Sequence, residues 1–323
     1  MGQRRRAYAA MVVIAGMLAA PLAATFRRVS RAQARRMTGQ CHVLGSLSSV
    51  VYAFLCYLLF ARLMHDHVIP WAFATRLRAL KDDAMRAAWG EKITALTLPI
   101  LVRVLCAVLL LPGWAHFSFR RGLDFRTTTW DGRCDVDSSG VAAARAFYTA
   151  RYMLAALMLY ELAATRAPHW SIVLHHVLTV VACTATTDAV LLETIGGDVS
   201  SGISNGVGFV TFFYDGLTAF EMALVLTYHL CAGQQPRQAA AMGAAAALQC
   251  LVTTCFFVML PAILLANAVG DASAAIVVLL ALVCVGMYVI ELFIASVRVN
   301  IARKKWREHR EAMVPKRPPD GAP

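Results

Sequence analysis

The chain has 323 residues, of which 59% are hydrophobic and only 15% charged, a composition that excludes an ordinary soluble domain and predicts an all-α, polytopic membrane protein. Its formal net charge of +12 would suggest nucleic-acid binding in a soluble protein, but the basic residues gather at the ends of apolar runs and in the C-terminal tail. We therefore expect membrane lipids, and no nucleic acid, as partners.

Eight apolar windows have the length of about 20 residues that a helix needs to cross a bilayer. In chain order they are 7–26, 41–64, 93–114, 141–164, 170–190, 203–229, 239–267 and 274–298. They predict seven or eight transmembrane helices, because the first window is either a retained span, a signal sequence or an interfacial helix.

The windows divide the chain into three parts. They are a basic N-terminal region, 1–40, a transmembrane domain, 41–298, and a basic, proline-rich tail, 299–323.

Lys and Arg are distributed unevenly between the loops. The loops after the fifth and seventh windows carry only acidic charges, whereas the alternate loops and the tail are basic, which predicts a cytosolic C-terminus. Basic residues between Arg27 and Arg36 fall on the opposite side, so the orientation of the N-terminus stays open. The stretch 70–89 is either an amphipathic surface helix or a solvated loop. The basic tail is expected to attract anionic lipid headgroups.

Cysteine and histidine spacing indicates no metal and no cofactor. Only Cys134 of the nine cysteines lies clear of the apolar windows, and no spacing suits zinc or a disulfide framework. Haem ligation by paired histidines is not favoured, because His42, His116 and His229 lie near window ends and not at one depth.

His175 and His176, with Thr179 one turn on, form an unusual polar group inside an apolar window. Imidazoles are costly at membrane depth, so the pair predicts a polar site inside the bundle or, alternatively, an interfacial helix end. Adjacent helical residues point about 100° apart, so one histidine is available for chemistry while a carboxylate such as Glu161 or Glu221 holds the other. The available imidazole would act as a general base or as a nucleophile towards an acyl group.

Several charged residues are predicted at the same depth, in the middle and cytosolic half of the bundle. Apart from the histidines they are Arg103, Arg151, Glu161, Asp215, Glu221 and Glu291. A charge near the bilayer centre costs at least about 2.5 kcal/mol, so we expect these groups to face one another or a wet cavity. Packing pairs between helices and an ion-coupled transporter are the alternatives, although the sequence has no internal repeat of the kind transporters show.

The runs Phe147-Tyr148-x-x-Arg151-Tyr152 and Tyr160-Glu161-Leu162, followed by Trp170 to Thr179 with its His-His-x-x-Thr element, resemble the core of the TLC-domain family. This family includes the ceramide synthases and other lipid-homeostasis proteins. The resemblance is specific in these runs. Outside them it rests only on the number and spacing of the spans, and it extends to residue 298 from about residue 93 or from residue 41. It implies a six-helix core, an interior able to hold acyl chains and an endoplasmic reticulum location. In the synthase branch it implies acyl transfer from acyl-CoA to a sphingoid base, with His175 and His176 as the catalytic histidines.

The synthase pattern is incomplete in the following span. Where the synthases carry His-Asp-x-x-Asp, this chain has Tyr214-Asp215-Gly216-Leu217-Thr218, which keeps the first aspartate and replaces the second by threonine. We therefore rank a relative that binds, senses or distributes sphingolipid or phospholipid ahead of an acyltransferase. Candidate catalytic residues are His175, His176 and Asp215, and candidate lipid-binding residues are Arg151, Tyr152, Glu161, Thr179, Tyr214, Glu221 and Glu291. The sequence leaves the lipid and the oligomeric state open.

Overall fold

A computed structural model describes residues 46–115, 138–164, 170–185, 213–267 and 274–313, with shorter pieces at 5–6, 9–13, 118–119 and 122–123 and single residues 16, 206 and 210. Within these residues the regular structure is helical and no strand occurs. The elements are α2 (Ser46–Leu63), the π-helical turn η1 (Met64–Val68), α3 (Ile69–Ala72), α4 (Ala74–Arg78), α5 (Asp83–Ala115), α6 (Ser138–Ala164), α7 (Trp170–Ala185), a helix over 213–230, α9 (Gln235–Asn267) and α10 (Ala274–Met313).

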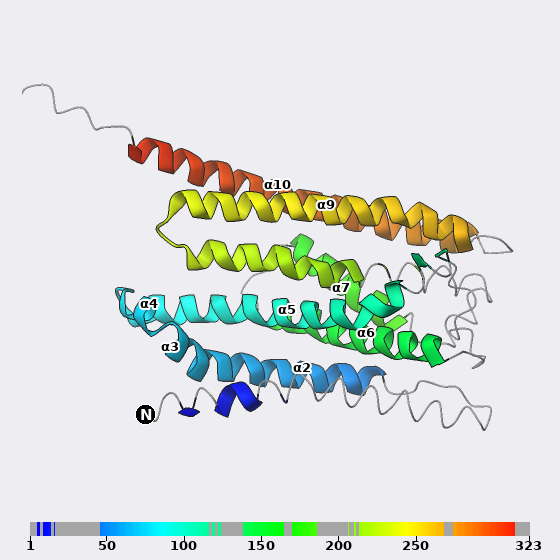
Figure 1. Cartoon of the computed structure of the whole chain (residues 1–323), viewed down its shortest axis with the longest axis horizontal. Coiled ribbons are helices and arrows are strands. Elements are labelled where there is room, and N and C mark those ends of the chain that lie inside the picture. Colours follow the sequence, from blue (N-terminus) through cyan, green and yellow to red (C-terminus); the bar gives the residue numbers. More distant parts are fainter. Residues whose placement is uncertain are drawn as a thin grey trace, which may run out of the picture.

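The long helices lie side by side along the longest axis of the molecule (Figure 1). α6 packs against α2, α5 and α7, while α9 packs along α10 and α7 touches α10. The helix 213–230 turns back into α9 through a tight turn in which Gly233 has a φ of 88°, a conformation that favours glycine.

Three helices are long and apolar enough to cross a membrane, namely Asp83–Ala115, Gln235–Ile263 and Val285–Met313. The helical architecture and these segments are those of a membrane protein. The larger number of seven or eight spans stays a prediction, and most of the first window, 7–26, lies outside the described residues.

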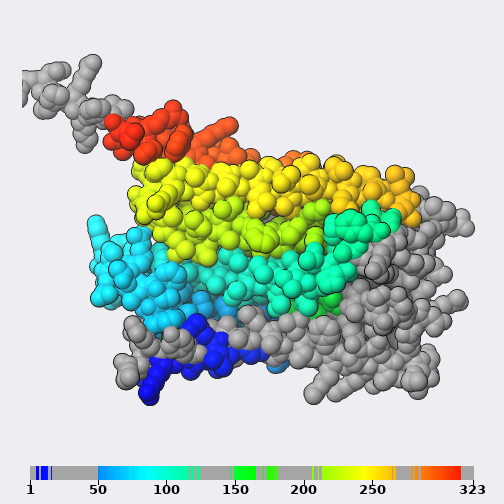
Figure 2. Space-filling view, in the orientation of Figure 1, coloured from blue at the N-terminus to red at the C-terminus, as the bar shows by residue number. Residues whose placement is uncertain are grey.

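Two helices extend beyond the apolar windows that predicted them. α5 begins at Asp83, where the Oδ1 atom of Asp82 accepts a hydrogen bond of 2.7 Å from the backbone N–H of Met85 and so caps the helix. α10 continues to Met313, well past the end of its window at 298, and its basic end projects from the body of the bundle (Figure 2). Hydropathy cannot detect these parts, because their residues are polar.

The stretch 70–89 is not one surface helix. Phe73, with φ −117° and ψ 28°, interrupts it between α3 and α4, and a turn then leads into α5. The Nη2 atom of Arg76 donates a hydrogen bond of 3.3 Å to the carbonyl of Ala232. This contact joins α4 to the turn before α9 at one end of the bundle.

A glycine sets the spacing between α5 and the helix 213–230. A Cβ atom added to Gly216 would lie 2.9 Å from the Cβ and the backbone N of Ala107, closer than side chains tolerate. The neighbouring residue, Asp215, is thereby brought within reach of Arg103 on α5.

Candidate functional site

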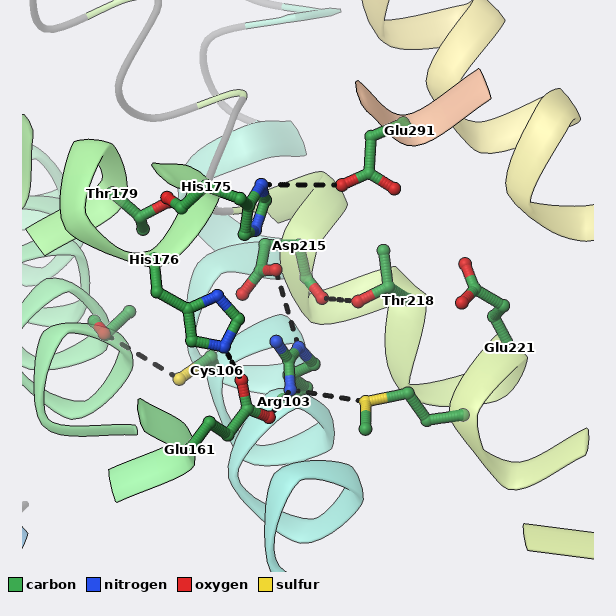
Figure 3. Close-up of polar contacts among 12 residues, drawn as sticks. Arg103, Cys106, Glu161, His175, His176, Thr179, Asp215, Thr218, Glu221 and Glu291 are labelled. Carbon is green, nitrogen blue, oxygen red and sulfur yellow. Dashed lines mark hydrogen bonds and ion pairs between the residues drawn. The ribbon is translucent and has the colours of Figure 1, made fainter. Parts of the chain in front are cut away.

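His176 on α7 is held by a carboxylate from α6. Its Nε2 atom lies 2.7 Å from the Oε2 atom of Glu161, and the residue is only 8% exposed (Figure 3). Its Nδ1 atom is buried and makes no hydrogen bond with the part of the chain that the structure describes. A carboxylate on one ring nitrogen favours the tautomer whose other nitrogen accepts protons.

Arg103 on α5 joins the histidine site to the helix 213–230. Its Nη1 atom lies 3.0 Å from Glu161 and its Nε atom 3.4 Å from Asp215, and the side chain is only 7% exposed. The Oδ2 atom of Asp215 is also buried and has no hydrogen-bond partner among the described residues. One oxygen of Asp215 therefore balances Arg103, while the other is available to a hydrogen-bond donor.

His175 turns towards α10, away from Glu161. Its Nδ1 atom lies 3.6 Å from the Oε1 atom of Glu291, and its ring centroid is 5.4 Å from that of His176. The two imidazoles therefore diverge, as predicted from the rotation between adjacent helical residues. Each meets its own carboxylate.

A second polar chain connects α9 and α10 with the helix 213–230. The side-chain amide of Gln249 donates a hydrogen bond of 2.6 Å to Glu291, and its carbonyl oxygen accepts one of 2.6 Å from Arg298. Arg298 also forms an ion pair with Glu221. Together with the contact between His175 and Glu291, these bonds connect the polar groups of all the helices that surround the site.

A cavity of about 430 Å³ lies among these side chains. Its lining residues include Lys92, Arg103, Glu161, His175, His176, Asp215, Thr218, Glu221, Met222, His229, Gln249, Glu291 and Arg298. The lining carries charges of both signs, because it holds both guanidinium groups and carboxylates. In the described part of the chain, no group of three or more His, Cys, Asp or Glu side chains is arranged to hold a metal ion.

A smaller pocket of about 80 Å³ adjoins the cavity and is mainly apolar. Its side chains are Val252, Thr253, Phe256, Met287, Tyr288, Tyr214 and Thr179, together with four residues that also line the larger cavity: His175, Asp215, Thr218 and Glu291. These four residues form a shared wall between a polar space and an apolar one.

The candidate site residues fall into three groups. His175, His176, Glu161, Asp215, Glu221 and Glu291 line the polar cavity, and Tyr214 and Thr179 line the apolar pocket. Arg151 and Tyr152 line neither space, since both are buried in the core that α6 forms with its neighbours. Thr179 also donates a hydrogen bond of 2.8 Å to the backbone carbonyl of His175.

Sequence reasoning missed four polar or basic residues that line the polar cavity: Gln249, Lys92, His229 and Arg298. Gln249 is uncharged and stands in an alanine-rich window, so charge counting passes over it. Lys92, His229 and Arg298 lie at or next to window ends, where basic residues are common, although the cavity reaches them. A search for every polar residue inside the windows would have found Gln249.

Comparison with known proteins gives no relative: no family model, curated protein or solved structure matches this chain.

Proposed function

We propose that this protein binds an amphiphilic lipid inside the bundle, with the polar headgroup in the larger cavity and the first carbons of the hydrocarbon chain in the apolar pocket. The observation that carries the proposal is the wall of His175, Asp215, Thr218 and Glu291 that the two spaces share. A molecule with one polar and one apolar end is the ligand class that such a pair of spaces complements.

The headgroup would meet hydrogen-bonding atoms that the fold leaves available. Asp215 Oδ2 accepts from a hydroxyl or an ammonium group, and the Nδ1 atom of His176 does the same when the ring is neutral. Burying such atoms without a partner costs about 1–3 kcal/mol each, so a ligand that satisfies them gains affinity. Thr218 contributes less, because its hydroxyl donates to the carbonyl of Asp215 at 2.6 Å.

The resemblance to the TLC-domain family supports the same proposal. It favours sphingolipid or phospholipid homeostasis as the process, by binding, sensing or distribution of lipid, and the endoplasmic reticulum as the location. The histidine pair then serves as a polar anchor for the headgroup.

An acyltransferase is the second candidate, and the His176–Glu161 pair favours it. With Glu161 on Nε2, the Nδ1 atom of His176 would take the proton as an amine attacks an acyl thioester, and the leaving thiolate would then receive that proton. We rank this candidate lower because Thr218 stands where the synthases carry their second aspartate. Membranes that contain the protein are expected to show no acyl-CoA-dependent acylation of a long-chain base. Turnover that disappears in the variant His175→Ala plus His176→Ala would reverse the ranking.

Lipid retention tests the primary proposal. The full chain, purified in a mild detergent, is examined by native mass spectrometry for bound lipid. We expect Asp215→Asn, which removes one headgroup acceptor, and Met287→Trp, which fills the apolar pocket, each to lower the bound fraction at least about tenfold. Thermal unfolding of each variant shows that it is folded.

Met313→Trp is the matched control, because Met313 is 71% exposed at the end of α10 and lines neither space. It should retain lipid as the wild type does. Wild-type protein that carries no lipid, or retention that neither pocket variant changes, would contradict the proposal.

A further inference from the structure

The polar cavity changes in charge along its length. Arg103 and Asp215, which are in contact, mark its inner level, where Glu161 and Glu291 also lie. At this level one guanidinium faces three carboxylates. Further along, Arg298 and Glu221 form a pair whose charges balance.

Two basic side chains line the cavity at its other end. Lys92 precedes Arg103 by three turns of α5, about 16 Å, and His229 follows Asp215 by about 21 Å along the helix 213–230. α5 begins at the end of the bundle where the helix 213–230 finishes, so both residues are displaced in the same direction (Figure 1). They lie at the end of the cavity on the side of α4 and the basic end of α10, and this end, defined by Lys92 and His229, is called the mouth below.

Among the described residues that line the cavity, no carboxylate forms an ion pair with these two groups. The carboxylates that line the cavity belong to the inner level or, in Glu221, to the pair with Arg298. Neither Lys92 nor His229 forms an ion pair with a carboxylate among the residues that the structure describes. Lys305 of α10 adds no unbalanced charge to this region, because it forms an ion pair with Glu308 at 2.8 Å.

We propose that the mouth of the cavity, formed by Lys92 and His229, binds a phosphate group. Lysine binds phosphate as a point charge, and a histidine ring donates a hydrogen bond. The phosphate group would come either from a lipid headgroup or from a soluble phosphate compound.

This inference goes beyond the proposed function, because the site lies about 16 Å from Arg103 and does not need a hydrocarbon chain in the apolar pocket. A compact headgroup cannot occupy the mouth and the histidine site at once. The two sites are therefore separable by experiment.

Binding of two probes to the purified full chain tests the inference. Inorganic pyrophosphate represents soluble phosphate, and phosphatidic acid in detergent micelles represents lipid phosphate. Dissociation constants are measured for the wild type and for Lys92→Gln, His229→Gln and the charge-preserving Lys92→Arg. We expect Lys92→Gln to weaken binding of the preferred probe roughly tenfold to a hundredfold, and His229→Gln to weaken it less, because histidine contributes a hydrogen bond and lysine a full charge.

Arg237→Gln is the control, since Arg237 is an exposed cation at the same end of the bundle that does not line the cavity. It should leave the dissociation constant within about twofold, and Lys92→Arg should keep most of the affinity. Binding of pyrophosphate alone identifies a soluble ligand, and binding of phosphatidic acid alone identifies a lipid. If the wild type binds neither probe, or if Lys92→Gln binds as the wild type does, the inference is wrong.

The outcome for the proposed function is read separately. A protein that binds phosphate at the mouth and retains no lipid in the native mass spectrum would keep this inference and lose the proposed function. A protein that retains lipid, but whose phosphate binding is unchanged by Lys92→Gln, would keep the proposed function and lose this inference.

Discussion

At the scale of single residues, Arg103 connects two carboxylates from different helices. Its guanidinium lies 3.0 Å from Glu161 and 3.4 Å from Asp215 and also contacts the sulfur of Met222 at 3.2 Å. Glu161 in turn holds His176. Removing the arginine would leave two buried carboxylates without their counter-ion.

Arg103→Met keeps an unbranched apolar stem and removes the guanidinium with its charge. We expect the free energy of unfolding to fall by about 3–5 kcal/mol, because breaking a buried ion pair leaves an uncompensated charge. Unfolding in detergent, followed by circular dichroism, measures the effect.

Arg62→Met is the control for that experiment. Arg62 pairs with Asp66 at 2.5 Å on the surface of α2, with 78% of its side chain exposed, so its loss should change stability by less than about 1 kcal/mol. Equal losses for the two variants would contradict the role given to Arg103.

Some of the site could be predicted from single residues and some could not. Charged and imidazole groups are rare in apolar windows, so His175, His176 and Glu161 could be identified from their cost alone. Depth does not determine which way a helical side chain faces. Arg151 and Glu161 are ten residues apart and thus about 80° apart around α6, which is why only Glu161 lines the cavity.

At the scale of elements, the position of Asp215 depends on how closely two helices approach. Gly216 packs against the backbone of Ala107 on α5, and a side chain at this position would collide with that backbone. Sequence alone could not show this, because Gly216 stands among several glycines with no pattern that marks a helix contact.

Gly216→Ala should separate α5 from the helix 213–230 and weaken the contact between Arg103 and Asp215. We expect a loss of about 1–3 kcal/mol in unfolding free energy, the usual cost of overpacking, together with weaker lipid retention. Thermal unfolding and native mass spectrometry measure the two effects.

Gly243→Ala on α9 is the matched control. A Cβ atom at Gly243 meets nothing within 4 Å, so alanine should leave stability unchanged or raise it by up to about 1 kcal/mol through its helix propensity. If Gly216→Ala were as stable as Gly243→Ala, the close approach of α5 to the helix 213–230 would not contribute to stability.

Helix ends were predicted less well than helix positions. The apolar windows locate α2, α5, α6, α7, α9 and α10, because each must present apolar residues to lipid or to its neighbours. They cannot show the polar first turns of α5 or the basic last turns of α10. Those turns form because a capping aspartate and good helix formers continue the hydrogen-bond ladder.

At the scale of the whole molecule, positive charge gathers at one end. α4, the turn at 231–234 and the basic end of α10 lie at the same end of the bundle (Figure 1). The positive-inside rule predicts that this end lies in the cytosol, and the phosphate site proposed for the cavity mouth would then face the same compartment.

Glycosylation mapping tests this orientation. The chain contains no Asn-x-Ser/Thr acceptor of its own, so an inserted acceptor reports its side without background. An acceptor inserted at Gly233 should stay unmodified when the protein is made in the endoplasmic reticulum. One inserted at Gly122, beyond the other end of α5, should be modified. Modification at Gly233 would reverse the topology.

The paired cavities are the property that the sequence could not supply, since they depend on how six helices come together. The sequence predicts charged groups at one depth, whereas the structure also shows an apolar pocket that shares four lining residues with the polar cavity. The proposed function requires that this pocket hold part of a hydrocarbon chain.

A photoactivatable lipid tests that requirement most directly. Purified wild-type protein is loaded with a lipid whose chain carries a diazirine close to the headgroup, irradiated, digested and sequenced by mass spectrometry. We predict adducts on the pocket side chains Val252, Phe256, Met287 and Tyr288. Adducts confined to exposed surface residues such as Val258, Leu265 and Leu282 would mean that the lipid binds only around the bundle, and would contradict the account.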